Sequence, residues 1–325
     1  MTPILRVRAG ARLHLGQLDL NGSLGRLYGG IGLALDKPCL VLDAQQADEL
    51  RIMSPPAEAP RVERFARRYL QHYALPGVSL GVREALPAHS GLGSGTQLAL
   101  AVGLAITKIY GLRPSLQELA VITEREGSRS GLGVATFKQG GFVVDGGKAL
   151  TGGETAAKAD LFVPPLIARF PFPREWRAVL VTPRASQKMS GSKEEAAFKA
   201  LPAMEAAVSG RISRLVLMRL LPALAEKDLG AFGQAVTVIQ EYLGDYFAPA
   251  QGGRFATAEG AAAAAYLAAE GAVGVGQSSW GPTVYGFVSR ERADALAAAI
   301  RQQAGDQAAV WVARGVNRGA RWVWN

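Results

Sequence analysis

"PAHSGLGSGTQLALAVG", residues 87–103, contains the most informative pattern in this chain. Three glycines fall within five positions, and residues 97–110, which follow, are apolar on almost every side. Such a run is typical of a buried helix. A helix that begins directly after a glycine-rich turn presents free N–H groups and the positive end of its dipole. The stretch therefore predicts an anion site, formed by Gly91, Leu92, Gly93, Ser94, Gly95, Thr96 and Gln97.

The glycine spacing differs from the two common nucleotide-binding loops. A Walker A loop needs Gly-Lys-Ser/Thr after four residues, whereas the chain has only Gly147–Lys148–Ala149. A Rossmann loop needs GxGxxG, and the spacing here is GxGxG. A turn that only packs a helix tightly on a sheet is the alternative to an anion site.

The composition indicates a globular chain. Its 325 residues, 49% of them hydrophobic, suffice for two domains or one large one. Arg6, Arg8 and Arg12 stand where an export signal needs an unbroken apolar segment. The longest apolar run, residues 98–107, is too short to span a bilayer. We therefore expect a cytoplasmic protein without a membrane partner.

The cysteine and histidine content excludes a disulfide frame and a His/Cys zinc site. Cys39 is the single cysteine, and His14, His72 and His89 fall into no paired spacing, so any metal should be bound by oxygen. The net charge of +9 raises nucleic acid as a partner. However, the basic stretch 61–69 is typical of the solvated face of a helix, and an anionic small substrate explains the charge equally well. We expect no nucleic-acid partner.

The predicted elements divide the chain into two parts. Strand-like stretches come first, at 5–15, 38–53 and 77–85, and helices follow, at 97–110, 115–126, 192–208, 211–227 and 229–243. The last part alternates helix 257–270, strands 272–276 and 283–288, helix 290–303 and strand 308–313. That order is typical of a ferredoxin-like unit. We expect an α+β fold with an N-terminal domain, 1–165, that carries the glycine loop, and a C-terminal ferredoxin-like domain, 166–325.

The loop pattern P-x-x-x-G-L-G-S-G-T resembles the phosphate loop, P-x-x-x-G-L-G-S-S-A, of the galactokinase, homoserine, mevalonate and phosphomevalonate (GHMP) kinase superfamily. The resemblance implies a GHMP-kinase-like fold, in which a ribosomal-protein-like α+β domain precedes a ferredoxin-like domain. It also implies that a late glycine-rich turn, here 274–286, supports the loop.

One position differs from the kinases of this superfamily. Their segment S-G-x-D-x-A-x-x-x-x-G-G carries an aspartate that serves as base or orients the substrate hydroxyl. The chain reads "SGLGVATFKQGG" at 130–141, with Gly133 in place of the aspartate. General-base help contributes about 10²- to 10⁴-fold to a rate. The substitution disfavours an ATP-dependent small-molecule kinase, which stays the alternative function.

A narrower resemblance covers residues 6 to about 290. The stretches 11–38, 129–147 and 277–287 are similar to the β-ribofuranosylaminobenzene 5′-phosphate synthase family of methanopterin biosynthesis. The resemblance implies condensation of 5-phosphoribosyl 1-pyrophosphate with 4-aminobenzoate, or with 4-hydroxybenzoate, and release of carbon dioxide and pyrophosphate. It implies Mg²⁺ on the pyrophosphate and no need for ATP. Because a ring carbon attacks the ribose, no hydroxyl has to be deprotonated, which agrees with Gly133.

The same resemblance assigns the candidate residues. Arg26, Asp19 and His14 are the catalytic candidates, with Arg26 as the leading carboxylate or phosphate partner because its planar fork suits bidentate contact. The substrate-binding candidates are Arg12, Asn21, Gly29, Gly30, Arg129, Ser130, Gly131, Lys188, Ser190, Gln277, Ser278, Ser279 and Trp280. Structural alternatives stay open: a buried His14, an Asx turn at Asn21, a surface Arg129 and a core Trp280.

The end of the chain is rich in arginine and tryptophan. Arg314, Arg318, Arg321, Trp322 and Trp324 lie within eleven residues of one another. An edge strand, a subunit contact and an anion-binding patch are all compatible with this pattern. The ligands of any metal stay unassigned, and a homodimer stays open as the assembly.

Overall fold

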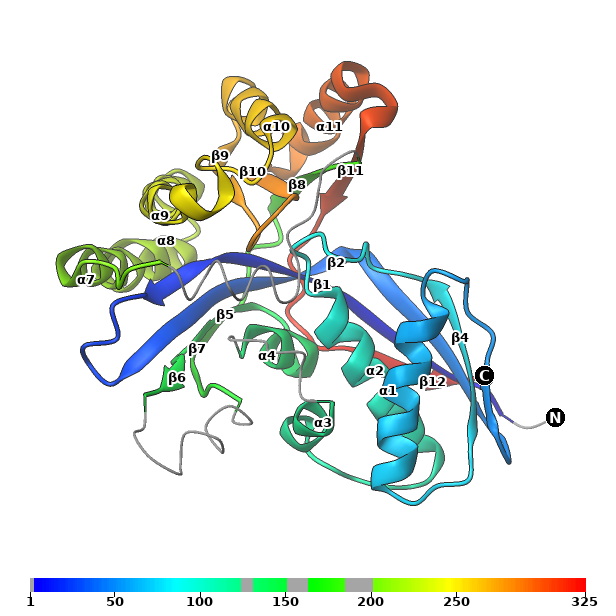
Figure 1. The fold of residues 1–325 in the computed structure, drawn as a ribbon. Helices are drawn as coiled ribbons and strands as arrows, with labels where there is room; N and C mark the ends of the chain where they lie inside the picture. Colours follow the sequence, from blue (N-terminus) through cyan, green and yellow to red (C-terminus); the bar gives the residue numbers. More distant parts are fainter. Residues whose placement is uncertain (1–2, 124–130, 151–162, 185–200) are drawn as a thin grey trace.

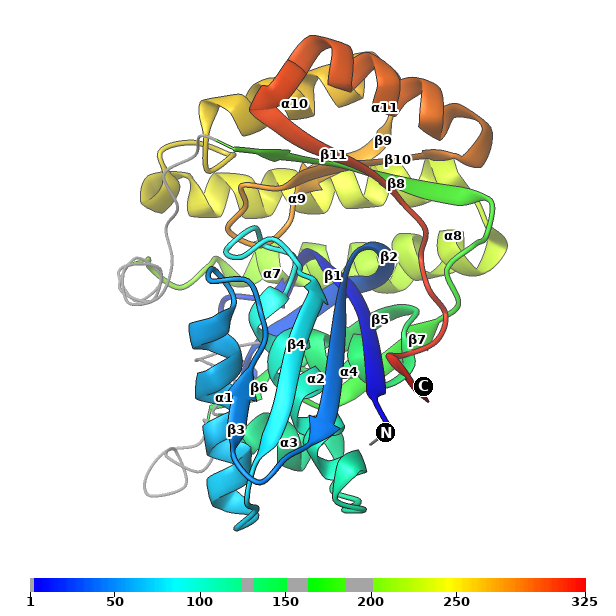
Figure 2. The same ribbon diagram turned by 90° about the vertical axis from the view of Figure 1, so that its right-hand side faces the viewer.

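A computed structural model of the chain describes residues 3–123, 131–150, 163–184 and 201–325. Within these residues the strands form an eight-stranded and a four-stranded sheet, with helices packed on both (Figures 1 and 2). The α+β class is confirmed. None of the described helices combines the length and the apolar character needed to cross a membrane.

The first sheet is built around a long hairpin. Its strands are β1 (Leu5–Asp19), β2 (Arg26–Gln46), β3 (Leu50–Ile52), β4 (Val78–Glu84), β5 (Phe142–Asp145), β6 (Lys148–Ala149), β7 (Leu166–Phe170) and β12 (Arg321–Trp324). The three strand-like stretches predicted from the sequence are confirmed. The first half of β2 was not predicted, because its glycine-rich residues 28–32 show no strand-like alternation.

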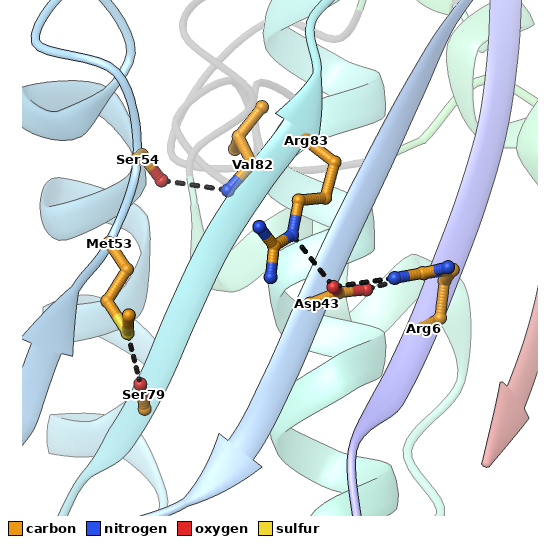
Figure 3. Close-up of polar contacts among 7 residues, drawn as sticks. All are labelled: Arg6, Asp43, Met53, Ser54, Ser79, Val82 and Arg83. Carbon is orange, nitrogen blue, oxygen red and sulfur yellow. Dashed lines mark hydrogen bonds and ion pairs between the residues drawn. The ribbon is translucent and has the colours of Figure 1, made fainter. Parts of the chain in front are cut away.

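Alternation along β1 gives the sheet a covered and an open face. Leu5, Val7 and Ala9 are buried, whereas Arg6 and Arg8 point outward. On the open face, Arg6 and Arg83 converge on Asp43 (Figure 3), with Nε–carboxylate distances of 2.6 and 2.9 Å. The hydrogen bonds from Arg6, and then from Arg83, lower the pKa of Asp43. This network fixes charges on the open face rather than forming a site.

Helices cover the inner face of the first sheet. They are α1 (Ala59–His72), α2 (Ser94–Ile109), α3 (Leu116–Ile122) and α4 (Leu132–Gln139). Helix α2 is buried along most of its length, as its apolar sequence predicts. Tyr69 of α1 joins the layer, because its hydroxyl donates to the carbonyls of Ala99 and Leu119 at 3.0 and 2.9 Å. Ser115 caps α3 by accepting from the Glu118 N–H at 3.1 Å, as predicted.

The second sheet has the ferredoxin-like order. Its strands are β8 (Trp176–Pro183), β9 (Val273–Gln277), β10 (Val284–Ser289) and β11 (Ala308–Ala313), arranged β11-β8-β10-β9 and antiparallel throughout. Helices α10 (Ala258–Ala269) and α11 (Arg290–Ala304) cover one face, and α9 (Leu229–Gln251) covers the other (Figure 2). Helix α9 also contacts β1, so it lies between the two sheets.

The helical bridge before α9 consists of α7 (Ala206–Leu215), a π-helical turn, η2 (Val216–Leu220), and α8 (Leu221–Glu226). Of the helix predicted at 192–208, residues 192–200 lie outside the described residues, and residues 201–205 are not helical, because α7 begins at Ala206. The helix predicted to end near residue 126 has its last turn outside them as well.

Two strands beyond residue 165 belong to the first sheet. Strand β7 pairs with β5, and β12 pairs with β1. Ile4 and Asn325 exchange backbone hydrogen bonds of 3.1 and 2.9 Å, so the two ends of the described chain lie side by side (Figures 1 and 2). The chain therefore enters the second domain once and returns. The division at 165 stays a prediction.

Candidate active site

The glycine loop ends in a helix N-terminus without a capping side chain. Gly93 is the N-cap of α2, at φ 76°, and no side chain hydrogen-bonds at this cap. The first bond of the helix runs from the Gln97 N–H to the Gly93 carbonyl, at 3.1 Å. The N–H groups of residues 94–96 therefore precede the helical ladder and are directed out of its end. A phosphate is the ligand for which such an end is suited.

The loop is held from two directions. The Leu92 carbonyl accepts from the Arg12 N–H at 3.0 Å. The Ser278 hydroxyl donates to the Gly91 carbonyl at 2.8 Å and accepts from the His14 N–H at 2.9 Å. A Cβ at Gly91 would lie 2.1 Å from the Ser278 carbonyl oxygen. The late turn at 277–281 thus packs directly on the loop, as the family resemblance implies, and Gly91 is needed for that contact.

Two arginines lie beside the first turn of α2. Arg12 lies against Gly93, where an added Cβ would be 3.2 Å from Nε. Arg61 of α1 donates from Nη2 to the Ser94 hydroxyl at 3.4 Å, and its Nη1 is 3.2 Å from Glu58. Arg12 was predicted, whereas Arg61 was missed because its helix was interpreted as a solvated face. Both guanidinium groups increase the positive potential at the helix end.

Position 133, where the kinases carry an aspartate, is packed closely against Thr96. Gly133 lies in the first turn of α4, and a Cβ there would be 2.7 Å from Thr96 Cγ2 and 3.0 Å from Thr96 Cβ. Gln97 reinforces the contact, because its Nε2 donates to the Gly133 carbonyl at 3.0 Å. An aspartate at 133 would therefore require α2 and α4 to move apart. The chain lacks both the base and the space for it.

His14 is buried behind the loop. Burial, and then the charge of Arg12, lower the pKa of His14 to about 3. The imidazole is therefore neutral at physiological pH and does not supply positive charge to an anion.

A small cavity lies where β1, α9 and the late turn meet. Its volume is about 50 Å³. His14 and Gln17 line it from β1, Phe247 and Gln251 from α9, and Ser279 and Trp280 from the turn. The Trp280 and Phe247 rings are 5.1 Å apart, centroid to centroid. The cavity combines aromatic faces with amide groups, a lining suited to a flat, polar aromatic molecule.

Gln240 and Arg254 complete this wall, and neither was predicted. Gln240 Nε2 donates to the Leu15 carbonyl, and its Oε1 accepts from the Gln277 N–H, both at 2.8 Å. Arg254 lines the cavity and makes a two-pronged ion pair with Asp245, at 2.5 and 2.9 Å. Gln240 joins the two domains at the cavity, and that contact depends on long-range folding which no local motif indicates.

The hairpin tip holds the other catalytic candidates away from the loop. Asp19 accepts from the Asn21 and Gly22 N–H groups at 2.7 and 3.0 Å, and Asn21 Nδ2 donates to the Met204 carbonyl at 2.6 Å. Asp19 lies five residues beyond His14 on β1, or about 16 Å at the rise of a strand. Asn21 Oδ1 also accepts from the Ser23 N–H at 3.0 Å, so the Asx turn at Asn21 is observed, and a catalytic role for Asp19 stays a prediction.

Arg26 is engaged by backbone carbonyls. It donates from Nε to Gly146 at 2.6 Å and from Nη2 to Gly147 at 2.7 Å. Gly147 in turn donates to the buried Asp145 carboxylate at 2.9 Å. The structure therefore places Arg26 in a network that fixes the hairpin. Its substrate role stays a prediction.

The remaining candidates fall into three groups. Gly29, at φ 74°, packs on its own hairpin, where a Cβ would be 3.0 Å from the Leu18 side chain, and Gly30 pairs with Gln17 within the sheet. The Gly131 N–H donates to Asp145 at 2.8 Å. Four candidates lie outside the described residues, namely Arg129, Ser130, Lys188 and Ser190.

Comparison with known proteins agrees with this geometry. The family models GHMP kinases N terminal domain and GHMP kinases C terminal match residues 61–141 and 220–306. A β-ribofuranosylphenol 5′-phosphate synthase from Methanothermobacter thermautotrophicus is 35% identical over 97% of this chain and 98% of its own length. The chain belongs to the β-ribofuranosylphenol 5′-phosphate synthase family.

Further similarities place this synthase-family member in a wider fold. The Archaeoglobus fulgidus β-ribofuranosylphenol 5′-phosphate synthase is 38% identical over 73% of the chain and 76% of its own length. The crystal structure of L. major mevalonate kinase in complex with R-mevalonate superposes with a TM-score of 0.72 at 13% identity, over 97% of this chain and 96% of that one. The GHMP-kinase-like fold predicted from the loop is confirmed.

Proposed function

We propose that this synthase-family member condenses 5-phosphoribosyl 1-pyrophosphate with a 4-substituted benzoate, releasing carbon dioxide and pyrophosphate. The observation that carries the proposal is the contact between Gly133 and Thr96. It removes the space for a kinase base and leaves the anion-binding end of α2 in place. The synthase names of relatives at 35% and 38% identity support the same reaction. The product is a ribosyl phosphate for methanopterin biosynthesis.

The glycine loop supplies the donor side of this reaction. The N–H groups at the start of α2, together with Arg12 and Arg61, hold the pyrophosphate and stabilise the negative charge that develops on it. As the bond from ribose C1 to the pyrophosphate oxygen breaks, its electron pair leaves with pyrophosphate. Positive charges already fixed at the helix end need no reorganisation during this step.

The acceptor side requires orientation rather than a base. The ring carbon that bears the carboxylate forms the new bond to C1. The bond from the ring to the carboxylate then breaks, carbon dioxide leaves, and the electron pair restores the aromatic ring. No hydroxyl proton has to be removed, so the neutral His14 and the missing aspartate agree with this chemistry.

The cavity beside Trp280 is the proposed site of the aromatic acid. Its volume of about 50 Å³ is well below the ~300 Å³ of an ordinary ligand site, so binding requires a side chain such as Trp280 or Gln251 to move. Trp280 and Phe247 would stack on the ring.

We propose that Mg²⁺ enters with the donor, bound to its pyrophosphate. Across the described residues, no three His, Cys, Asp or Glu side chains gather so as to hold a metal ion. A magnesium ion held mainly by the phosphates of the substrate and by water needs no such cluster. We propose no ATP requirement, and small molecules rather than nucleic acid as the partners.

The test follows the carboxylate. Incubation with carboxyl-labelled 4-hydroxybenzoate or 4-aminobenzoate, Mg²⁺ and the donor should release one labelled carbon dioxide for each pyrophosphate. Pyrophosphate without labelled gas, or a product that keeps its carboxylate, would reject the reaction. A parallel assay with ATP and small alcohols tests the kinase alternative, which acceptor-dependent ADP formation would restore.

A further inference from the structure

A second, larger cavity lies beside β1. Its volume is about 330 Å³, and it shares no lining residue with the smaller cavity. β1 and the bend of β2 form two walls, and the chain segment 314–321 closes the third. Gln97 and Thr136, both buried, line it from α2 and α4. A volume of this size falls within the range of ~300–1,000 Å³ that small-molecule sites occupy.

The walls of this cavity are built by backbone pairing. Gly10 pairs with Cys39 and Arg12 with Ala34, so residues 35–38 of β2 bend away from β1. The C-terminal segment fills part of the gap, with bonds from the Val316 N–H to the Ala34 carbonyl at 2.9 Å and from the Ala320 N–H to the Phe137 carbonyl at 2.8 Å. The opening that remains is therefore a fixed feature of the fold.

Five cations and one carboxylate line the cavity: Arg8, Lys37, Arg314, Arg318, Arg321 and Asp36. Asp36 binds the backbone N–H and the Nε of Arg314, both at 2.7 Å. Among the described residues that line the cavity, Asp36 and Arg314 form an ion pair. The lining keeps a clear excess of positive charge.

Two of these arginines are placed where one anion could contact both. Arg8 and Arg321 are directly paired across β1 and β12. Like charges directly opposite each other on neighbouring strands are destabilising. An anion between them removes the repulsion and gains charge-assisted hydrogen bonds from both guanidinium groups.

We propose that this cavity binds a small molecule that carries two or more phosphate groups, at a site separate from the active site. Concavity favours a small ligand over nucleic acid, which needs a basic stripe along the surface. At the inner wall, Gln97 Nε2 donates to the Gly133 carbonyl and the Thr136 hydroxyl to the Leu132 carbonyl, so these side chains offer the ligand acceptor oxygens. The ligand would contact α2 at Gln97, the last residue of the phosphate loop.

Calorimetric titration with inorganic tripolyphosphate tests the proposal. Replacing the facing pair, in Arg8→Ala/Arg321→Ala, should weaken one binding component by at least about tenfold, because two charge-assisted contacts are lost. Lys37→Ala/Arg318→Ala removes two cations outside the paired strands and should do the same. The control, Arg113→Ala/Arg211→Ala, removes two exposed arginines of other regions and should leave binding unchanged.

Three outcomes would overturn the proposal. Unchanged tripolyphosphate binding in both cavity variants, with native circular dichroism, would show that the cavity is not the site. An equal loss of tripolyphosphate binding in the Arg113→Ala/Arg211→Ala control would show that binding depends only on the overall positive charge of the protein. Loss of single-stranded DNA binding in the cavity variants, with tripolyphosphate binding intact, would identify a nucleic-acid surface. The cavity variants should keep the condensation activity. A loss of tripolyphosphate binding in them can therefore be separated from a failure of the proposed reaction.

Discussion

Arg61 is the residue whose role the structure changes most. It comes from a helix that resembles an ordinary amphipathic surface helix, yet its side chain reaches Ser94 at the start of α2. We expect Arg61→Ala to weaken binding of 5-phosphoribosyl 1-pyrophosphate about tenfold, or ~1.4 kcal/mol, because a charged partner of the pyrophosphate is lost. Calorimetry measures this directly. Arg67→Ala on the exposed face of the same helix, where Arg67 pairs with Glu63 at 2.6 Å, should have no effect.

Gly133 allows close packing of α2 on α4. We expect Gly133→Ala to destabilise the protein by about 1–3 kcal/mol, the usual cost of overpacking, because its Cβ would meet Thr96. Adding Thr96→Ala removes Cγ2 and should recover part of the loss. Thermal or denaturant unfolding of the two single variants and the double variant gives the coupling energy. Strictly additive effects would contradict the contact.

His14 makes stability depend on pH in acid. Its pKa is about 3 when folded against 6.5 ordinarily, so below pH 6.5 the unfolded chain binds a proton that the folded chain does not. Stability therefore falls as the pH drops, by up to about 1.4 kcal/mol per pH unit between pH 6 and 4. Denaturant unfolding of His14→Gln should show a shallower slope than the unsubstituted protein. His72→Gln, at an exposed position, is the control for replacing a histidine by glutamine.

At the scale of elements, the first turn of α2 can be tested with matched glycines. Gly93 and Gly111 have φ values of 76° and 68°, but an added Cβ at Gly111 meets nothing within 4 Å, whereas at Gly93 it meets Arg12. Alanine at either position should cost about 1–2 kcal/mol of backbone strain. Only Gly93→Ala should also raise the dissociation constant of the phosphoribosyl donor. Equal donor affinity in the two variants would show that the loop does not bind the pyrophosphate.

Most elements could be predicted because their patterns are local. The buried helix after the glycine loop and the strand at 5–15 follow from periodicity, and the cap at Ser115 follows from its spacing to Glu118. The first half of β2 could not be predicted in this way. Its glycines adopt a strand because β1 and β5 pair with them, and those partners come from distant parts of the sequence.

The same distinction holds for the candidate site. The glycine loop, Arg12 and the turn at 277–280 carry motifs, and the structure brings them together. Gln240, Arg254 and Arg61 belong to ordinary helical or loop sequences, so only tertiary packing reveals their position. Asp19 and Arg26 carry a motif too, but Asp19 bonds within the hairpin and Arg26 bonds to the turn between β5 and β6. A family motif therefore indicates which residues are constrained without separating binding from folding.

At the scale of the whole molecule, β1 lines both the cavity beside Trp280 and the basic cavity. Arg12 contacts the glycine loop and His14 lines the cavity beside Trp280, whereas Arg8 and Gly10 line the larger cavity. One strand thus contributes to both anion-binding regions. Tripolyphosphate bound at the cavity should raise the melting temperature of the protein, because a ligand that binds only the folded state stabilises it. A melting temperature independent of tripolyphosphate would contradict both sites at once.

The pairing of β12 with β1 also has a consequence during synthesis. β1 leaves the ribosome early, whereas its outer neighbour begins at Arg321. At about 5–20 residues per second, roughly 15–60 s separate the two. Throughout that interval the outer edge of β1 is exposed in the nascent chain, and an unpaired strand edge promotes aggregation. Arg6 and Arg8 alternate with its buried residues, and charged side chains on an unpaired strand disfavour its pairing with other chains.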